Sequence, residues 1–579
     1  MLWDVRLHET QAHALDAAEW EAAIFSLQAS LTDAAIDRAV RALPEPIYAE
    51  VGDYWTTVLR GRRDRLAEMA QEYYDLQAHT VDVLGSDERE AFDAVRSPDG
   101  RLTVTVRSYK GGEDGRELYR REFLPSETEE VRLYGFAGRD VFRLTGEGPD
   151  RIALRVIAGA GDDEIIAPAG HVAIYDTPDG ATLSDLGPRV EDQRSDDPDV
   201  NRYDETEHVL GDRKLFPTAG YRATDGVLIG ATAVWNVPGF RLRPFAATHT
   251  LSVNYATTTS GVAGSYTGRM KKAVGAFDLD VDAFASTPRY ARNFYGLGNG
   301  SRNIPGDLAR VDLAQVRARA GFGTPLGQGL RLIVGPTARF ADASRGELAI
   351  LPDDGPTPLS QLPDASFEAQ AHAGGFGRLE ASTASLGPNP FQGLRVMAEG
   401  SVFAGLTGPA DTYGTVGGEA VAYIPVRLAP QLTLALRAGA EHRIGDFPFF
   451  DGAVLGGPGT VRGYRRERFT GRTAASASAE ARMKLFNVDA YVLPLQVGAL
   501  GFVDAGRVWD NRYVNCGITG DCVPPLTPFQ LTPTFSSDDL QLGYGGGLWI
   551  GVLDAAVVNL TVGASDEATL FTFGVGFAY

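Results

Sequence analysis

The sequence predicts a mainly β protein whose larger part, residues 215–579, is a transmembrane antiparallel β-barrel. Segments from residue 215 onward alternate apolar and polar residues, which is typical of strands with two different faces. The candidate strands number about 16, and single-chain bacterial barrels have an even number of strands. The chain ends with an aromatic or apolar residue at every second position: Phe571, Phe573, Val575, Phe577 and Tyr579. Such a tail predicts a last strand with one lipid face, although a core strand of a soluble sandwich is the alternative.

The chain before the barrel divides into a helical segment (1–95), a small β module (96–176) and an acidic linker (177–214). Apolar residues between positions 59 and 76 recur at spacings of three, four and seven, which predicts one apolar helix face. Short alternating runs separated by turn residues predict the β module. The arginine-rich run 60–65 is interpreted as a solvated helix face rather than a binding patch.

Two turns of the β module, 135–142 and 158–165, resemble a calcium-binding G-G-x-G-x-D-x-U repeat with one position missing. Their aspartates, Asp140 and Asp163, are of the type that supplies hard oxygen ligands to calcium. Calcium solenoids stack many adjacent copies, and we expect other strands to separate these two turns. The preferred interpretation is therefore tight turns in a β-stack, with calcium at Asp140 and Asp163 as the alternative. No other cofactor is expected.

Charged residues in the barrel strands predict which faces line the lumen. Asp278, Asp280 and Asp282 alternate with apolar residues, as do Arg317 and Arg319. An arginine at the lipid midplane costs roughly 2–4 kcal/mol, so these faces are expected to point inward. The long connections all fall on one side if the first strand runs outward, as expected of external loops. They are about 286–308, 343–365, 442–472 and 510–538.

A glycine-rich loop, 455–464, carries the candidate functional site. The loop residues of interest are Val461, Arg462, Gly463 and Tyr464. Two later strands each bear an acid. Glu480 lies on the charged face of the first, and Asp504 of the second shares a face with Phe502 and Gly506.

An arginine inside a barrel is costly unless it is paired. Arg462 has the donors for a forked pair of hydrogen bonds to one carboxylate and a third bond to another. We therefore expect Arg462 to hold the loop against the inner wall through Glu480 and Asp504. This expected clasp has a structural role and not a catalytic one.

These motifs resemble the barrel of the BamA/TamA outer-membrane assembly superfamily, also called the bacterial surface antigen family, over roughly residues 215–579. Val461-Arg462-Gly463-Tyr464 matches its V-R-G-F/Y loop, and residues 502–506 match its F-x-D-x-G strand motif. Glu480 stands where the family's strand acid is expected, and residues 294–299 resemble a further loop signature. The resemblance implies a loop that folds back into the lumen and a barrel that opens between its first and last strands.

The resemblance extends to the end of the chain. Phe573, Phe577 and Tyr579 resemble the C-terminal assembly signal of outer-membrane barrels. The first strand, near 215–221, contains Pro217 and Gly220, which weaken ladder pairing.

Cys516 and Cys522 fall in a polar loop between predicted strands. A small loop disulfide in an oxidising compartment is the preferred interpretation, and two free thiols are the alternative.

Composition limits the compartment and the partners. The net charge of −21 argues against a nucleic-acid partner. No apolar run approaches the roughly 20 residues of a membrane helix. The start of the chain lacks a signal-peptide pattern, so we expect a segment upstream of it. The expected setting is the bacterial outer membrane, with lipid and lipopolysaccharide around a monomeric barrel and the N-terminal part in the periplasm.

Three functions fit this sequence, and none is enzymatic. The chain contains no H-E-x-x-H, G-x-S-x-G or Walker motif, so no catalytic residue is predicted. The first function is protein insertion or translocation with client or partner proteins, although residues 1–176 do not divide into the POTRA modules of such proteins. The second is a barrel that anchors or exports an upstream module, for example a metallophosphoesterase. The third is a pore or a structural surface antigen.

Overall fold

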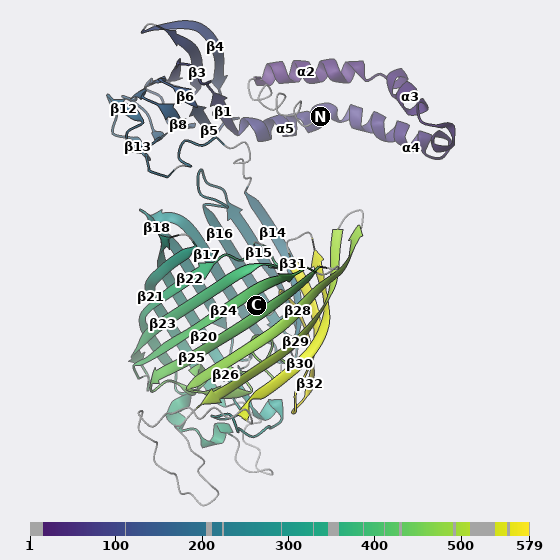
Figure 1. Cartoon of the computed structure of the whole chain (residues 1–579), viewed down its shortest axis with the longest axis vertical. Coiled ribbons are helices and arrows are strands. Elements are labelled where there is room, and N and C mark those ends of the chain that lie inside the picture. The colour runs from purple at the N-terminus through teal and green to yellow at the C-terminus, as the bar shows by residue number, and fades with distance from the viewer. Residues whose placement is uncertain are drawn as a thin grey trace, which may run out of the picture. The chain divides into compact units, whose positions relative to one another are not determined.

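The protein forms two compact units, Met1–Glu207 and His208–Tyr579 (Figure 1). The computed structural model describes residues 15–577 except 111, 198, 204–210, 223–224, 291, 328, 346–357, 386, 410, 428–430, 490–493, 510–538 and 553–555.

The first unit begins with helices that pack as antiparallel neighbours. They are α2 (Ala17–Ser30), α3 (Asp33–Arg41), α4 (Glu45–Asp64) and α5 (Leu66–Ala78). A capping box between Asp16 and Glu19 starts α2, because each side chain accepts the other's backbone N–H. The indole of Trp20 donates to the carbonyl of Ala70 at 3.0 Å and ties α2 to α5. The helices end at Ala78, well before the expected boundary at residue 95, because a buried strand begins at Thr80.

Two sheets follow the helices and form a parallel β-solenoid. The first sheet has the order β1 (Thr80–Leu84), β5 (Glu130–Tyr134), β8 (Ala153–Ile157), β11 (Val172–Tyr175) and β13 (Val190–Asp192). The second has the order β12 (Ala181–Ser184), β10 (Asp163–Ile166), β7 (Val141–Thr145), β2 (Glu90–Arg96), β3 (Leu102–Lys110) and β4 (Glu113–Phe123). The chain passes from one sheet to the other in each coil, and the stacked strands are parallel except in the β2–β3–β4 meander.

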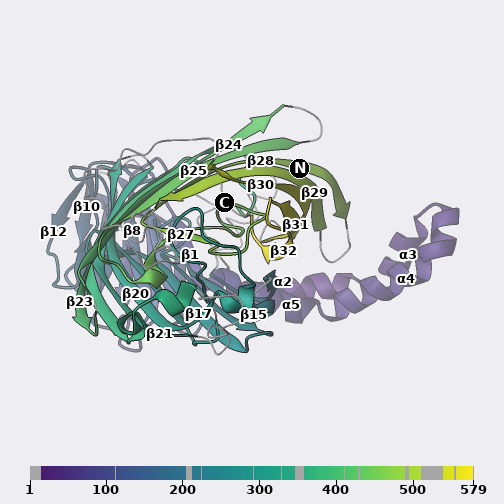
Figure 2. The same ribbon diagram turned by 90° about the horizontal axis from the view of Figure 1, so that it is seen from below.

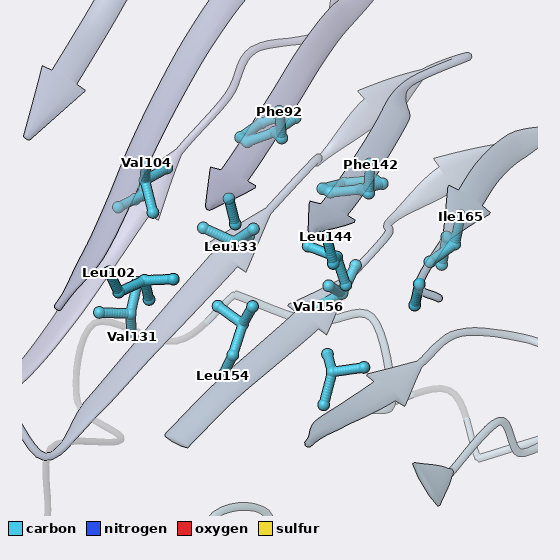
Figure 3. Close-up of a cluster of buried hydrophobic side chains, with 14 of the residues drawn as sticks. Phe92, Leu102, Val104, Val131, Leu133, Phe142, Leu144, Leu154, Val156 and Ile165 are labelled. Atoms are coloured by element: carbon cyan, nitrogen blue, oxygen red, sulfur yellow. The ribbon is translucent and has the colours of Figure 1, made fainter. Parts of the chain in front are cut away.

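The solenoid core lies between the two sheets and is apolar (Figure 3). Phe92 and Phe142 stack with their ring centroids 4.7 Å apart, and Leu133 and Val156 of the other sheet belong to the same buried cluster. Burying a side chain of this size stabilises the fold by roughly 1.5–3 kcal/mol. This core explains why short strands with few local contacts hold together.

The two glycine- and aspartate-rich turns are direct neighbours, and the expectation that other strands separate them is wrong. Their centres are the short strands β6 (Ala137–Gly138) and β9 (Ala160–Gly161), which pair in parallel. The strands between the turns in sequence return to the same sheets one coil later, so the turns stack in space.

Part of the expected acidic linker belongs to the solenoid. Strands β12 and β13 fall within residues 177–214, so the β module extends beyond residue 176. Tyr203 lies with its ring centroid 4.9 Å from that of Tyr134. Asn201 donates to the carbonyl of Gly159 at 2.6 Å. Residues 201–203 therefore pack back on the solenoid.

The second unit is a closed antiparallel barrel of sixteen strands, which confirms the predicted fold class. The strands are β14 (Asp212–Arg222), β15 (Gly226–Val237), β16 (Ala247–Ala256), β17 (Gly261–Val274), β18 (Phe277–Ser286), β20 (Arg310–Gly327), β21 (Leu330–Arg345), β22 (Gln370–Ser382), β23 (Gly393–Thr407), β24 (Tyr413–Val426), β25 (Leu432–Gly445), β28 (Thr473–Asp489), β29 (Pro494–Trp509), β30 (Gln541–Val552), β31 (Ala556–Ala564) and β32 (Thr569–Val575). The two-residue β19 (Arg292–Asn293) adds a short pairing to β20 beside β18.

The barrel closes at a seam between β14 and β32, which are joined by one residue pair among the residues that the structure describes, Tyr221 with Phe573. By contrast, β14 pairs with β15 along its whole length, from Asp212 to Arg222. The seam is thus the weakest pairing around the ring.

The two faces of the wall separate as the alternation predicts. Ile229, Val402 and Val503 are exposed on the outer face. Arg331 donates to both Asp278 and Asp280 on the inner face, and Arg319 pairs with Asp282 at 2.9 Å. The three acids of β18 are therefore each paired with an arginine inside the barrel.

Candidate functional site

The connection between β25 and β28 enters the barrel. It contains the short helix η6 (Phe449–Asp451) and the paired strands β26 (Ala453–Leu455) and β27 (Phe469–Gly471). Seen end on, β27 lies inside the ring of barrel strands (Figure 2). The residues between β26 and β27 form the tip loop, 456–468. Gly456, Gly457 and Gly463 adopt positive φ angles there, so the tip loop turns where other residues would be strained.

Arg462 of the tip loop binds two carboxylates of the wall. Its Nε donates to Asp504 Oδ2 and its Nη2 to Asp504 Oδ1, both at 2.8 Å, and its backbone N–H donates to Asp504 Oδ2 at 2.9 Å. Its Nη1 donates to Glu480. The guanidinium carbon lies 3.5 Å from the ring centroid of Phe502. The structure thus brings together Arg462, Glu480, Phe502 and Asp504, and we refer to them as the clasp.

The charged residues of the clasp are buried, so each of them depends on its partners. Arg462 is 7% exposed, Glu480 1% and Asp504 0%. A buried ion pair is not strongly stabilising by itself, but removing one partner leaves an uncompensated buried charge. The geometry therefore suits fixation of the tip loop.

The remaining loop residues fill the space around the clasp. Val461 and Tyr464 are buried with Phe469 in one apolar cluster. A Cβ on Gly506 would stand 2.9 Å from Val461 Cγ2, so the glycine of the strand motif makes room for Val461. Tyr464 donates to Gln541 Oε1 at 2.9 Å and also to Asp566.

Glu480 is shared between the clasp and the end of the chain. Its Oε1 accepts from Arg482 Nε at 2.7 Å. The guanidinium carbon of Arg482 lies 3.9 Å from the ring centroid of Phe577, and Trp549 contacts the same ring edge to face at 5.8 Å. Trp549 and Arg482 are buried inner-wall residues. The C-terminal end of the chain is therefore joined to the clasp through Arg482.

Phe577 does not share the lipid face expected for the last strand. Strand β32 ends at Val575, and Gly576 has a φ of 87°, which turns the chain. Gly576 N–H then donates to Val557 O at 2.7 Å, and Phe577 packs against inner-wall residues. Phe573 stays in the strand, opposite Tyr221 at the seam. Tyr579, Cys516 and Cys522 lie outside the described residues.

Several residues of the site were not predicted. A Cβ on Gly543 would overlap the carbonyl oxygen of Arg462, and a Cβ on Gly563 would stand 2.8 Å from Gly463 N. Gly543 of β30 and Gly563 of β31 thus leave room for the tip loop. The glycine-rich run 543–547 in the sequence was the available signal for the first of them. Arg468 also binds Glu567 through two bonds, at 2.7 and 2.6 Å, and no local motif indicated that pair.

Asp140 and Asp163 form a ladder between coils of the solenoid. Asp140 Oδ1 accepts the backbone N–H of Glu90, and Asp163 Oδ1 accepts that of Asp140, both at 2.8 Å. The second oxygen of each is buried without a hydrogen-bond partner among the described residues. Burial raises the pKa of Asp140 to about 8 and that of Asp163 to about 6. Among the same residues, no three His, Cys, Asp or Glu side chains are arranged to hold a metal ion.

We expect the solenoid to lose stability as the pH rises. The folded pKa of Asp140 lies above its ordinary value of 3.8, so the folded state holds a proton that the unfolded state releases. This contribution is fully present below about pH 3.8 and is lost as the pH rises toward 8. Between pH 6 and 8 the free energy of unfolding should fall by about 2 kcal/mol. Hydrogen exchange of the solenoid amides in the full chain would measure this.

Asp140→Asn is the matched variant, because the amide keeps an oxygen for Glu90 N–H and removes the titration. Its solenoid protection should change much less over the same pH range, because only Asp163, with a pKa of about 6, still titrates there. If calcium instead raised protection of the unsubstituted chain at pH 8 and had no effect on the variant, the buried oxygen would be an ion ligand and not a proton site.

The Omp85 superfamily domain model matches residues 247–576. A computed superposition relates the chain to BamA from Haemophilus ducreyi lacking POTRA domains 1–3, with a TM-score of 0.41 and 14% identity over 63% of this chain and 70% of that one. For CdiB from Escherichia coli the TM-score is 0.41 and the identity 13%, over 64% of this chain and 63% of that one. At these values neither likeness carries an argument about function.

No curated protein sequence matches the chain. None of the helices that the structure describes is both long and apolar enough to span a membrane. The family match covers more than half of the chain and includes the tip loop, both clasp acids and the last strand. The chain therefore belongs to the Omp85 superfamily, and its second unit is an outer-membrane β-barrel of that type.

Proposed function

We propose that this protein inserts polypeptides into the outer membrane, or passes them across it, through an opening between β14 and β32. The observation that carries the proposal is that only one pair of described residues, Tyr221 with Phe573, joins the two strands of the seam. Pro217 in β14 has no N–H to donate, and β32 ends at Val575, so both edges offer few ladder bonds. An incoming strand would find free backbone groups on both edges.

The clasp complements this seam. It fixes the tip loop to β28 and β29, which lie away from β14, so the wall there stays closed while the seam is free to part. The proposed orientation has the four long connections outside and the first unit in the periplasm, as the side of the long loops indicates. Client polypeptides are the expected partners.

A disulfide across the seam tests the proposal. Tyr221→Cys with Phe573→Cys, in a chain with Cys516→Ser and Cys522→Ser, places thiols on opposed positions. Oxidised protein in lipid vesicles should insert a client barrel at least about tenfold more slowly than the same protein after reduction, because separation of the strands is required. The control pair is Ala420→Cys with Ala438→Cys, which lie opposite each other on β24 and β25. Equal insertion by the oxidised and reduced seam pair would refute the proposal.

A second function, an anchor or export barrel for an upstream module, is favoured by one observation. Among the described residues of the first unit, every helix precedes every strand, so the unit shows no repeated mixed helix–strand module. An anchor has no need of seam opening. This function would be favoured by two results together. An upstream module would be displayed equally well with the seam pair oxidised or reduced, and no client barrel would be inserted.

A further inference from the structure

A cavity of about 350 Å³ lies against the inner wall formed by β17, β18 and β20–β24. None of the four clasp residues lines it. Its charged lining consists of three arginines and two acids, namely Arg317, Arg319, Arg339, Asp282 and Glu399.

Both acids that line the cavity already form ion pairs. Arg319 pairs with Asp282 at 2.9 Å and with Glu399 at 3.1 Å. Arg378 approaches the same Glu399 at 2.6 Å. Arg339 pairs with Asp451 of η6. Neither lining acid is left to neutralise a further cation.

Arg317 is a cation of the lining that remains without an acidic partner among the described residues. Its guanidinium makes no ion pair or hydrogen bond with any residue that the structure describes, and its side chain is exposed to the lumen. Its guanidinium carbon lies 4.7 Å from the ring centroid of Phe284. An arginine held over an aromatic ring keeps its N–H edge free for an anion.

Hydroxyl groups complete the lining. Ser265, Thr267, Ser401 and Thr415 line the cavity, and their hydroxyls make no hydrogen bond to another described residue. Ser401 is 8% exposed and faces the cavity. Each of these hydroxyls has one O–H donor, which a bound oxyanion can accept.

We propose that this cavity binds a phosphate-sized oxyanion, either free inorganic phosphate or the phosphate group of a small monoester. Arg317 supplies the charge and a fork of donors, and the hydroxyls of Ser401 and Thr415 supply further donors. The site is separate from the seam and does not depend on the proposed insertion function.

Isothermal titration of the full chain in detergent with inorganic phosphate, at ionic strength held constant with chloride, tests this site. The unsubstituted chain should bind one phosphate, and Arg317→Gln should weaken binding by about tenfold or more, since it removes a charge-assisted hydrogen bond. Arg317→Lys keeps the charge and should weaken binding less. The matched control is Arg395→Gln, because Arg395 lies on the same face of β23 as Glu399 but outside the cavity.

The outcomes distinguish free phosphate from a phosphate monoester and show whether the site exists. Glycerol 3-phosphate binding as tightly as phosphate would support a monoester ligand, and phosphate binding alone would support the free ion. If no saturable binding is measured, or if Arg395→Gln weakens binding as much as Arg317→Gln, the site does not exist.

Discussion

Arg462→Ala is expected to release the tip loop and to destabilise the barrel by roughly 3–5 kcal/mol, the cost of leaving a buried charge unpaired. Asp504 would lose three hydrogen bonds, because the freed loop also withdraws the backbone N–H of residue 462. Glu480 would keep Arg482, so Asp504 carries most of the loss. Urea unfolding in lipid vesicles, followed by the gel mobility of folded and unfolded barrel, would measure the free energy.

Arg465→Ala is the matched control for this prediction. Arg465 belongs to the same loop, and its guanidinium donates to the carbonyl of Ile304 at 3.3 Å instead of to a buried carboxylate. It should cost less than about 1 kcal/mol. The combination Arg462→Ala with Asp504→Ala removes both buried charges and should be less destabilising than the sum of the single changes. An Arg462→Ala barrel as stable as the unsubstituted one, with an equally protease-resistant loop, would rule out the clasp.

Gly543→Ala is expected to expel the loop without changing any charge. The new Cβ would overlap the carbonyl oxygen of Arg462, whose residue is held by its own N–H bond to Asp504. The loop cannot shift without breaking the clasp. We therefore expect the free energy of unfolding to fall by about 1–3 kcal/mol because of overpacking and weakened clasp bonds. Protease cleavage within residues 456–468 in intact vesicles would report the released loop.

Gly501→Ala provides the comparison. A Cβ at this position of β29 would meet its nearest neighbour, Gly545 O, at 3.9 Å. The loop of this variant should resist protease as the unsubstituted chain does. Cleavage in both glycine variants would mean that any added methyl loosens the sheet, and cleavage in neither would mean that the wall has room for one.

The barrel was predictable from sequence because lipid and water impose opposite demands on alternate residues. Asp280 and Arg319 could only face the lumen, and that is where they pair with other strands. Alternation also indicated Glu480, which lies on the charged face of its strand, whereas Asp504 shares its face with Phe502 and Gly506 and was indicated by the F-x-D-x-G motif. Their role as a clasp stays a prediction until Arg462→Ala is measured.

Other features depend on geometry that a local pattern does not contain. Alternation continues through Phe577 in the sequence, whereas the chain turns inward because Gly576 adopts a positive φ. The solenoid was missed because its parallel strands pair between coils, so Asp140 and Asp163 are distant in sequence and adjacent in space. The wall glycines, such as Gly543, have no side chain from which a contact could be inferred.

Amide hydrogen exchange along the barrel in lipid bilayers would show directly whether strand pairing is weakest between β14 and β32. Amides of these two strands should exchange at least about tenfold faster than those of β28 and β29, which pair along their lengths and hold the clasp. If the amides of β14 and β32 were as protected as those of β28 and β29, the seam would be as closed as the rest of the wall. That result would contradict an opening between β14 and β32.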